Sequence, residues 1–140
     1  MIVVDTNVVA YLFIDGTYTA EARRCFLQDP QWCVPQLWRS EFRSILSLYL
    51  CKNQLSVDEA ANMAREAEAL MEGREYVVSS EAVLDLVSDS VCSAYDCEFV
   101  ALARHLGVSL VTADKQLLRA FAADTVSLAG FAGKPRQKRS

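Results

Sequence analysis

Four acidic residues lie in otherwise apolar or small-residue surroundings in this chain of 140 residues: Asp5, Glu41, Asp96 and Asp114. Asp5 closes the apolar run at residues 1–4, and Asp114 follows the run at residues 108–113. A carboxylate in such a place is costly to bury unless a cation receives it. If the fold brings the four together, they form an acidic pocket suited to a hard divalent metal, which prefers oxygen ligands.

Glu41 and Asp96 each interrupt an apolar helical face. Their neighbours on those faces are Leu37, Ile45 and Leu48 for Glu41, and Cys92, Phe99, Val100 and Ala103 for Asp96. Taken singly, each of the four acids could instead cap a helix or pair with a nearby arginine. Two acids at strand ends and two on apolar helix stripes, all without an obvious buried base, together favour a shared site.

Three other acids fit this site less well. Glu98 lies on roughly the opposite helix side from Asp96 and is expected at the surface. Asp124 opens the last expected strand and is a weaker, supporting candidate. Asp15 is expected to form a turn with Gly16.

Short β-rich runs alternate with helical patterns along the chain. Strands are expected at 2–4, 32–34, 76–78, 109–111 and 125–128, and helices at 6–14, 19–28, 36–51, 56–72, 80–88, 93–106 and 114–122. This alternation predicts an α/β fold with a parallel sheet and helices on both faces. Ligands in such sheets bind beyond the carboxyl ends of the strands, and this rule places Asp5 and Asp114 at one edge.

Composition indicates a single soluble domain, with 52% hydrophobic and 23% charged residues. No apolar stretch reaches the roughly 18 residues that span a membrane, and the N-terminus lacks a basic start, so a cytoplasmic protein is expected. The five cysteines form no CxxC pair and there is one histidine, which gives a Cys/His zinc site little support.

The net charge of −4 is unevenly distributed. The segment 134–139 carries four basic residues and no acidic one, which leaves ten basic against eighteen acidic residues elsewhere. We therefore expect a domain at 1–130 and a basic, flexible tail at 131–140, which could also touch an anionic partner such as RNA.

The acidic residues stand in four segments, at 2–7, 40–42, 93–103 and 111–118, whose order and spacing resemble those of the PIN-domain nucleases. The chain is most similar to the VapC-type toxins of bacterial toxin–antitoxin pairs. The resemblance implies a three-layer α/β/α sandwich around a parallel five-stranded sheet. It also implies an endoribonuclease that depends on Mg²⁺ or Mn²⁺, a homodimer and a cognate antitoxin.

Position by position, Asp5, Glu41, Asp96 and Asp114 match the acidic quartet of that family, and Thr6 and Asn7 match its polar residues beside the first acid. Some members add an acid shortly after the fourth. This chain has Gln116, Leu117 and Leu118 there. We therefore expect one metal ion at the acidic site and not two.

Each residue of this set has an expected role in phosphodiester hydrolysis. Asp5 and Asp96 would bind the metal directly, and Asp114 directly or through water. Glu41 would orient or deprotonate the attacking water, and Thr6 and Asn7 would hold a carboxylate or the phosphate. Four flanking cations could grip the substrate backbone or be ordinary solvated charges: Arg39, Arg43, Lys115 and Arg119.

Other classes fit less well. Asp15-Gly16-Thr17 resembles part of a phosphohydrolase DxDGT loop, but Phe13 stands where the nucleophile should be. A receiver domain needs an acidic pair at the first strand, where this chain has Asp5 and Thr6. The serious alternative is a PIN-like module that binds RNA or protein without catalysis.

Apolar residues of the two long central helices mostly suit a core, with an excess that could serve a dimer or an antitoxin helix: Trp38, Phe42, Leu46, Tyr49, Leu55, Leu70 and Met71.

Overall fold

A five-stranded parallel sheet forms the centre of the molecule in the computed structural model, which describes residues 1–133. Its strand order is β3-β2-β1-β4-β5. The strands are β1 (Ile2–Val4), β2 (Trp32–Pro35), β3 (Glu75–Tyr76), β4 (Leu110–Thr112) and β5 (Thr125–Ser127). The predicted α/β class with a parallel five-stranded sheet is confirmed.

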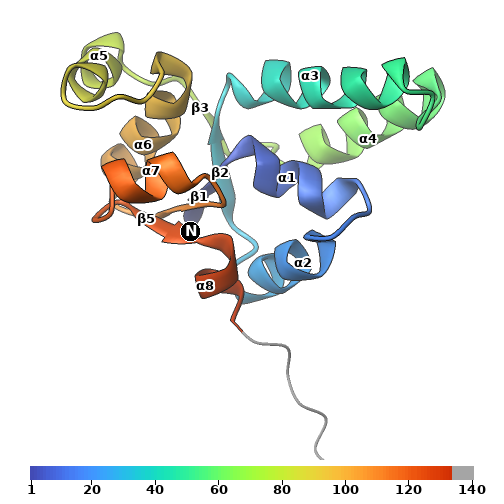
Figure 1. The fold of residues 1–140 in the computed structure, drawn as a ribbon, viewed down its shortest axis with the longest axis horizontal. Coiled ribbons are helices and arrows are strands. Elements are labelled where there is room, and N and C mark those ends of the chain that lie inside the picture. The colour runs from blue at the N-terminus through green and yellow to red at the C-terminus, as the bar shows by residue number, and fades with distance from the viewer. Residues whose placement is uncertain (134–140) are drawn as a thin grey trace, which may run out of the picture.

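Helices cover both faces of this sheet (Figure 1). They are α1 (Thr6–Phe13), α2 (Thr19–Gln28), α3 (Trp38–Cys51), α4 (Val57–Leu70), α5 (Ser80–Ser88), α6 (Ala94–Leu106), α7 (Lys115–Ala120) and α8 (Leu128–Ala132). In Figure 1, α5 and α6 lie on one side of the sheet and α1 to α4 on the other. The result is a three-layer sandwich.

The central strand β1 explains why the sheet is stable between two helical layers. Ile2, Val3 and Val4 are all buried, since helices pack on both of their faces. β-branched side chains favour such a pleated, fully covered position. β1 pairs with β2 on one side and with β4 on the other, and Val4 lies opposite Val111. This register fixes which residues meet where the strands end.

Local signals fix the helix ends. Ser56 and Glu59 form a capping box at the start of α4, where each side chain bonds the other residue's backbone N–H. Ser93 caps α6, whose last turn ends at Gly107 with φ 67°. Only glycine adopts this left-handed conformation without a steric cost.

Most expected element bounds differ from the structure by one or two residues, and the C-terminal end of the domain differs in kind. The last strand ends at Ser127 rather than Leu128, because Ser127 caps a short helix, α8, that sequence patterns did not predict. α8 packs on α2, where the Gln28 side chain donates a 2.8 Å hydrogen bond to the carbonyl of Ala132. Because α8 ends at Ala132, the folded domain continues past the expected boundary at residue 130. The basic residues of the expected tail, 134–139, lie outside the described residues.

The apolar residues of the two long helices divide between core and surface. Trp38, Phe42, Leu46 and Met71 are buried and belong to the core, while the others of that set are partly buried against it. Within residues 1–133, no helix has the length and apolar character needed to cross a membrane.

Candidate active site

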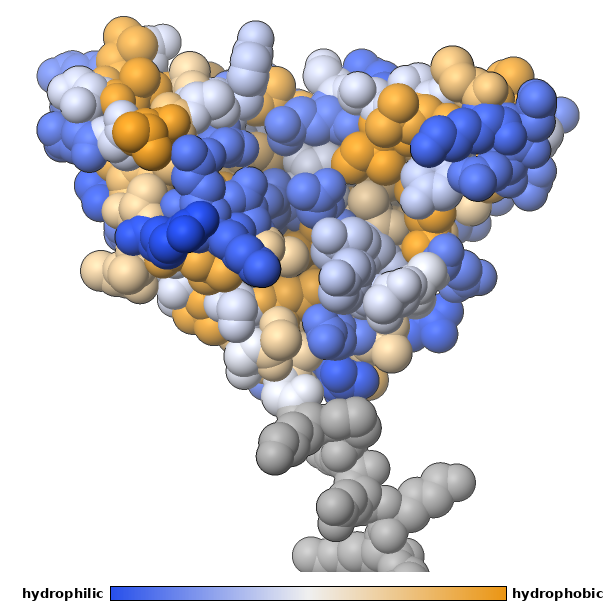
Figure 2. Space-filling model, viewed as in Figure 1, coloured by the Kyte–Doolittle hydropathy of each residue, from blue (hydrophilic) through white to orange (hydrophobic). Residues whose placement is uncertain are grey.

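All four predicted carboxylates line one pocket, of about 250 Å³, at the carboxyl edge of the sheet. Its lining consists of Asp5, Thr6, Asn7, Glu41, Ser44, Ile45, Asp96 and Asp114. The residues come from the ends of β1 and β4 and from the starts of α1, α3 and α6. Hydrophilic residues occupy the middle of the face shown in Figure 2, between the lobe of α5 to α7 and the lobe of α1 to α4.

Asp5 is the most buried of the four acids, with 8% of its surface exposed. Its backbone N–H bonds the carbonyl of Val111 at 3.1 Å, which places it beside Thr112 of the neighbouring strand. The Thr112 hydroxyl donates a 2.8 Å hydrogen bond to Asp5 Oδ2. Asp5 makes no side-chain cap to α1, so its position is not explained by ordinary helix capping.

Glu41 enters the pocket from the first turn of α3. The buried Thr6 hydroxyl donates a 2.8 Å hydrogen bond to Glu41 Oε1. One carboxylate oxygen of Glu41 is thereby fixed, and the side chain is aimed at the residue next to Asp5.

Asp96 and Asp114 lie at the starts of two helices. The Ser93 hydroxyl accepts from the backbone N–H of Asp96 at 3.1 Å, which fixes the first turn of α6. Asp114 Oδ1 accepts from the backbone N–H groups of Gln116 and Leu117, at 2.8 and 3.1 Å, and so caps α7. For Asp114 the capping interpretation is therefore correct, yet the same residue also lines the acidic pocket.

The carboxylates repel one another. Burial, followed by the charges of Asp96 and Asp114, raises the pKa of Asp5 despite the hydrogen bond from Thr112. Burial and then Asp114 raise the pKa of Asp96. Burial, followed by Asp5, Asp96 and Glu98, raises the pKa of Glu41 despite its bond to Thr6. Among the described residues none of the four carboxylates forms an ion pair, and no lysine or arginine lines the pocket.

This oxygen-rich, uncompensated pocket fits a hard divalent cation. Within residues 1–133 no three Asp, Glu, His or Cys side chains are close enough to form a preassembled metal cluster. Mg²⁺ does not require one, because it keeps several waters and takes one or two carboxylates together with substrate phosphates. The acids suited to this are Asp5, Asp96 and Asp114, and a cation between them would relieve the repulsion that raises the pKa values of the first two.

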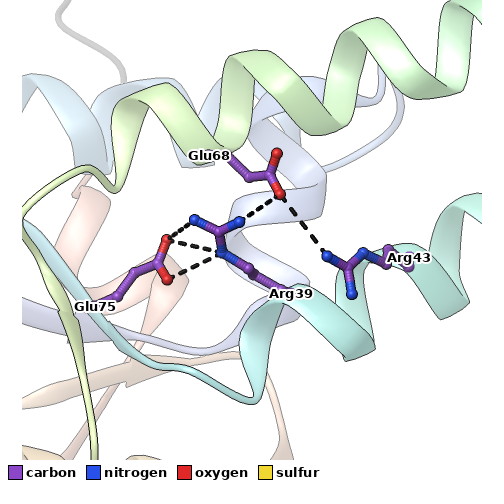
Figure 3. Close-up of polar contacts among 4 residues, drawn as sticks. All are labelled: Arg39, Arg43, Glu68 and Glu75. Atoms are coloured by element: carbon purple, nitrogen blue, oxygen red, sulfur yellow. Dashed lines mark hydrogen bonds and ion pairs between the residues drawn. The ribbon is translucent and has the colours of Figure 1, made fainter.

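The four flanking cations divide into two pairs. Arg39 does not line the acidic pocket and is held by Glu75 and Glu68, as Figure 3 shows. Arg43 lies beside the same cluster, with its guanidinium 3.9 Å from Glu68. Lys115 and Arg119 are exposed on α7, directly after Asp114, and neither forms an ion pair with another described residue.

The less favoured acids lie elsewhere. Asp124 forms a bidentate ion pair with the Arg104 guanidinium, with N–O distances of 3.0 and 2.9 Å. It lies before β5, at the amino edge of the sheet, and therefore cannot support the pocket at the carboxyl edge. Glu98 is partly buried rather than fully exposed, and it lines a separate pocket with Val78 and Val83.

Two residues near the acids were not among the predicted site residues. Ser44 lies three residues after Glu41 on α3 and lines the pocket. Thr112 is fully buried beneath the pocket and contacts both strand-end acids. Its hydroxyl donates to Asp5 and accepts from the Asp114 N–H at 3.0 Å. A polar residue inside a buried strand was the available signal for Thr112, and helical spacing from Glu41 was the signal for Ser44.

Comparison with known proteins gives consistent results. The family described as "PIN domain" matches residues 2–122. The chain is 27% identical over 125 residues to "Ribonuclease VapC3" of Pyrobaculum aerophilum, a match that covers 87% of this chain and 95% of that protein.

Two solved structures share the fold. The crystal structure of FitAcB from Neisseria gonorrhoeae has a TM-score of 0.69 at 16% identity, covering 94% of this chain and 99% of that one. A toxin–antitoxin complex from Klebsiella pneumoniae has a TM-score of 0.66 at 19% identity, covering 92% and 98%.

Proposed function

Because the chain belongs to the PIN-domain family, we propose that it is a divalent-metal-dependent endoribonuclease and the toxin of a toxin–antitoxin pair. The observation that carries the proposal is the convergence of Asp5, Glu41, Asp96 and Asp114 in one pocket that no cation of the described part of the chain faces. The ribonuclease similar to this chain supports RNA as the substrate. The toxin–antitoxin complex of the same fold supports a protein antitoxin as partner.

The acids would divide the work of hydrolysis among them. Asp5 and Asp96 would bind the cation, and Asp114 would offer the carboxylate oxygen that does not cap α7. When bound, Mg²⁺ or Mn²⁺ lowers the pKa of a water, polarises the phosphoryl oxygen and stabilises the leaving oxygen. Asn7, exposed at the pocket rim, can donate to a phosphate oxygen.

Glu41 is the candidate general base. The Thr6 hydroxyl occupies Oε1 and leaves Oε2 to accept a proton from the attacking water. The raised pKa of Glu41, caused mainly by burial, brings this carboxylate closer to the pH at which a general base is most effective. Lys115 and Arg119 on α7 are the better placed of the four flanking cations to hold the RNA backbone, since Arg39 is engaged by two glutamates.

The test compares isosteric variants in a cleavage assay with single-stranded RNA. Asp5→Asn and Asp96→Asn should abolish cleavage in Mg²⁺ or Mn²⁺ while circular dichroism shows a folded protein. Glu41→Gln should lower kcat by about a hundredfold or more. Asp85→Asn, an exposed acid on α5, is the matched control and should cleave like the unaltered protein. Full activity of Asp5→Asn, or undiminished cleavage in excess EDTA, would contradict the mechanism.

A PIN-like module that binds RNA or protein without catalysis is the competing function. Such a module has no need of a cation at this pocket. Calorimetric titration with Mn²⁺ should show one site in the unaltered protein and none in Asp96→Asn. Binding of RNA without metal uptake or cleavage would favour the binding module.

We also propose that the protein is cytoplasmic and forms a homodimer. All five cysteines are free thiols and four of them are buried, which suits a reducing compartment. Exposed apolar side chains on α5 and its flanking loops offer a surface for a second copy.

A further inference from the structure

A groove runs from the acidic pocket along α1 and α3. We name it the tyrosine groove. The residues that form the basis of the inference are Tyr11, Tyr18, Leu48 and Tyr49, together with Asn7 and Ile45, which also line the acidic pocket. The two hollows therefore adjoin at Asn7 and Ile45. An RNA strand with a phosphate at the four carboxylates would therefore have this groove beside it.

Helical spacing explains why the two hollows adjoin. Asn7 and Tyr11 are four residues apart on α1, and Glu41, Ile45 and Tyr49 follow one another at the same spacing on α3. Side chains at this spacing lie on one helix face. Both stripes thus start at the acidic pocket and end at a tyrosine. From Asn7 to Tyr11 the helix rises about 6 Å, so the groove extends only a short way from the carboxylates.

The aromatic end of the groove is preformed. The rings of Tyr11 and Tyr18 pack with centroids 4.9 Å apart at an angle of 40°, and 48% of Tyr18 is exposed. The buried Thr19 hydroxyl holds the turn before it, because it accepts from Gly16 N–H at 3.0 Å and donates to the carbonyl of Ile14 at 3.2 Å. An exposed aromatic face fixed in this way can bind a flat ligand without ordering cost.

Charge indicates which part of a nucleic acid this groove accepts. Among residues 1–133 its lining contains Asp15 and no lysine or arginine, so these residues do not suit phosphates. Bases are uncharged, stack on aromatic rings, and can bond polar groups at their edges, here the tyrosine hydroxyls and Asn7. Burial, followed by the charges of Tyr18, Asp5 and Tyr49, raises the pKa of Tyr11, so its hydroxyl stays protonated and able to donate.

We propose that the tyrosine groove binds the unpaired nucleobase that adjoins the scissile phosphate of the RNA substrate, with Tyr18 as its stacking platform. The proposal rests on the proposed ribonuclease function. It makes Tyr18 and Tyr49 determinants of substrate choice: the enzyme cuts single-stranded RNA and prefers large, strongly stacking bases beside the cleaved bond.

The experiment separates binding from cleavage. A single-stranded oligoribonucleotide with 2-aminopurine at successive positions is titrated in Mg²⁺ against the Glu41→Gln protein, which retains the proposed metal ligands. Tyr18→Leu in this background keeps an apolar side chain but removes the ring, and should raise Kd about tenfold. Tyr18→Phe keeps the ring and should bind within about twofold of the parent. Leu27→Ala changes an apolar side chain on α2 that is 81% exposed and outside the groove, and should have no effect.

The outcomes distinguish this proposal from the function on which it rests. If the unaltered protein cleaves RNA but Tyr18→Leu binds it as tightly as the parent, the groove proposal is overturned and the ribonuclease stands. The groove proposal is likewise overturned if Tyr18→Leu instead releases a bound protein partner and leaves RNA affinity unchanged. If the unaltered protein neither cleaves nor binds RNA, both proposals fall. A tenfold weaker Kd, with the 2-aminopurine signal lost only beside the cleaved bond, supports both.

Discussion

Thr112 joins two of the four carboxylates through a single hydroxyl group. It donates to Asp5 and accepts from the backbone of Asp114, and it is fully buried. Thr112→Val keeps the shape but leaves both partners unsatisfied, so the free energy of unfolding should fall by about 1–2 kcal/mol. Urea unfolding at neutral pH measures this change.

The same substitution should also move the pH profile. The hydrogen bond from Thr112 opposes the burial that raises the pKa of Asp5. Without the bond, the acidic limb of kcat/KM should move to higher pH. Thr112→Ser retains the hydroxyl and should restore most of the activity. An unchanged pH profile in Thr112→Val would show that this residue acts on stability alone.

The crowded carboxylates should cost stability when no metal is bound. The pKa of Asp96 in the folded protein is raised above its ordinary value of 3.8, by burial and then by Asp114. A raised pKa means that the folded state holds the proton more tightly than the unfolded chain. The associated stability is fully present below pH 3.8 and is lost as the pH rises through the higher, folded value.

Asp96→Asn should therefore stabilise the metal-free protein at pH 7. We expect its melting temperature in EDTA to be higher by about 2–4 °C, with the difference shrinking toward pH 4. Added Mn²⁺ should raise the melting temperature of the unaltered protein more than that of the variant. A lower melting temperature for Asp96→Asn at pH 7 in EDTA would contradict the repulsion that we infer.

Sequence patterns could predict which acids meet, but not how they are held. Asp5 and Asp114 follow apolar strands, and Glu41 and Asp96 interrupt apolar stripes, so residue type and spacing were sufficient to name them. The role of Thr112 depends on the register between β1 and β4, which pairs residues more than 100 positions apart. Local patterns carry no information on such a pairing.

At the level of elements, a network of ion pairs connects α3 and α4 to β3 at the edge of the sheet (Figure 3). Arg39 on α3 bonds Glu75 of β3 through two nitrogens and Glu68 of α4 through a third. β3 has only two residues, so side-chain contacts contribute much of what holds it. The network thereby steadies the start of α3, from which Glu41 enters the pocket.

Arg39→Met should lower the free energy of unfolding by about 1 kcal/mol, because it leaves the partly buried Glu75 without a partner and Glu68 with only the more distant Arg43. Arg43→Met should change it little, since this side chain is 63% exposed and only approaches Glu68 at 3.9 Å. Chemical denaturation of the two variants checks the difference. Equal effects would mean that the network is merely a solvated surface cluster.

The elements themselves were predictable to a varying degree. The helices at 19–28 and 80–88 have the expected bounds. Ser79 caps the second helix, whereas the first has no side-chain cap at its start. The start of α3 was placed two residues early, since Gln36 and Leu37 continue the helical pattern but lie in a turn after Pro35. α8 escaped prediction because its five residues are too few to show a period.

At the scale of the whole molecule, one apolar surface has no partner within the described residues. Val77, Leu84, Val91 and Tyr95 are each more than 60% exposed and lie on α5, its flanking loops and the start of α6. Figure 2 shows apolar residues gathered at the outer end of this lobe. Trp38 and Phe42, which the sequence offered as candidates for a dimer surface, are instead in the core.

We expect this surface to form the homodimer. Leu84→Glu should shift the protein from dimer to monomer in size-exclusion chromatography with light scattering. Leu27→Glu, at an 81% exposed position on α2, is the matched control and should leave the dimer intact. A monomeric unaltered protein at high concentration, or dissociation by Leu27→Glu alone, would rule this interface out.

Asp114 has two duties, and this has a consequence for how such proteins diverge. One of its oxygens caps α7, while the residue also lines the acidic pocket. A descendant that loses catalysis no longer needs the pocket but still needs the helix. In a lineage drifting toward a silent binding protein, we therefore expect Asp96 and Glu41 to change first and Asp114 to persist. An aspartate at this position, without the other three acids, thus indicates only that the helix is capped. Nuclease activity should be judged from Asp5, Glu41 and Asp96.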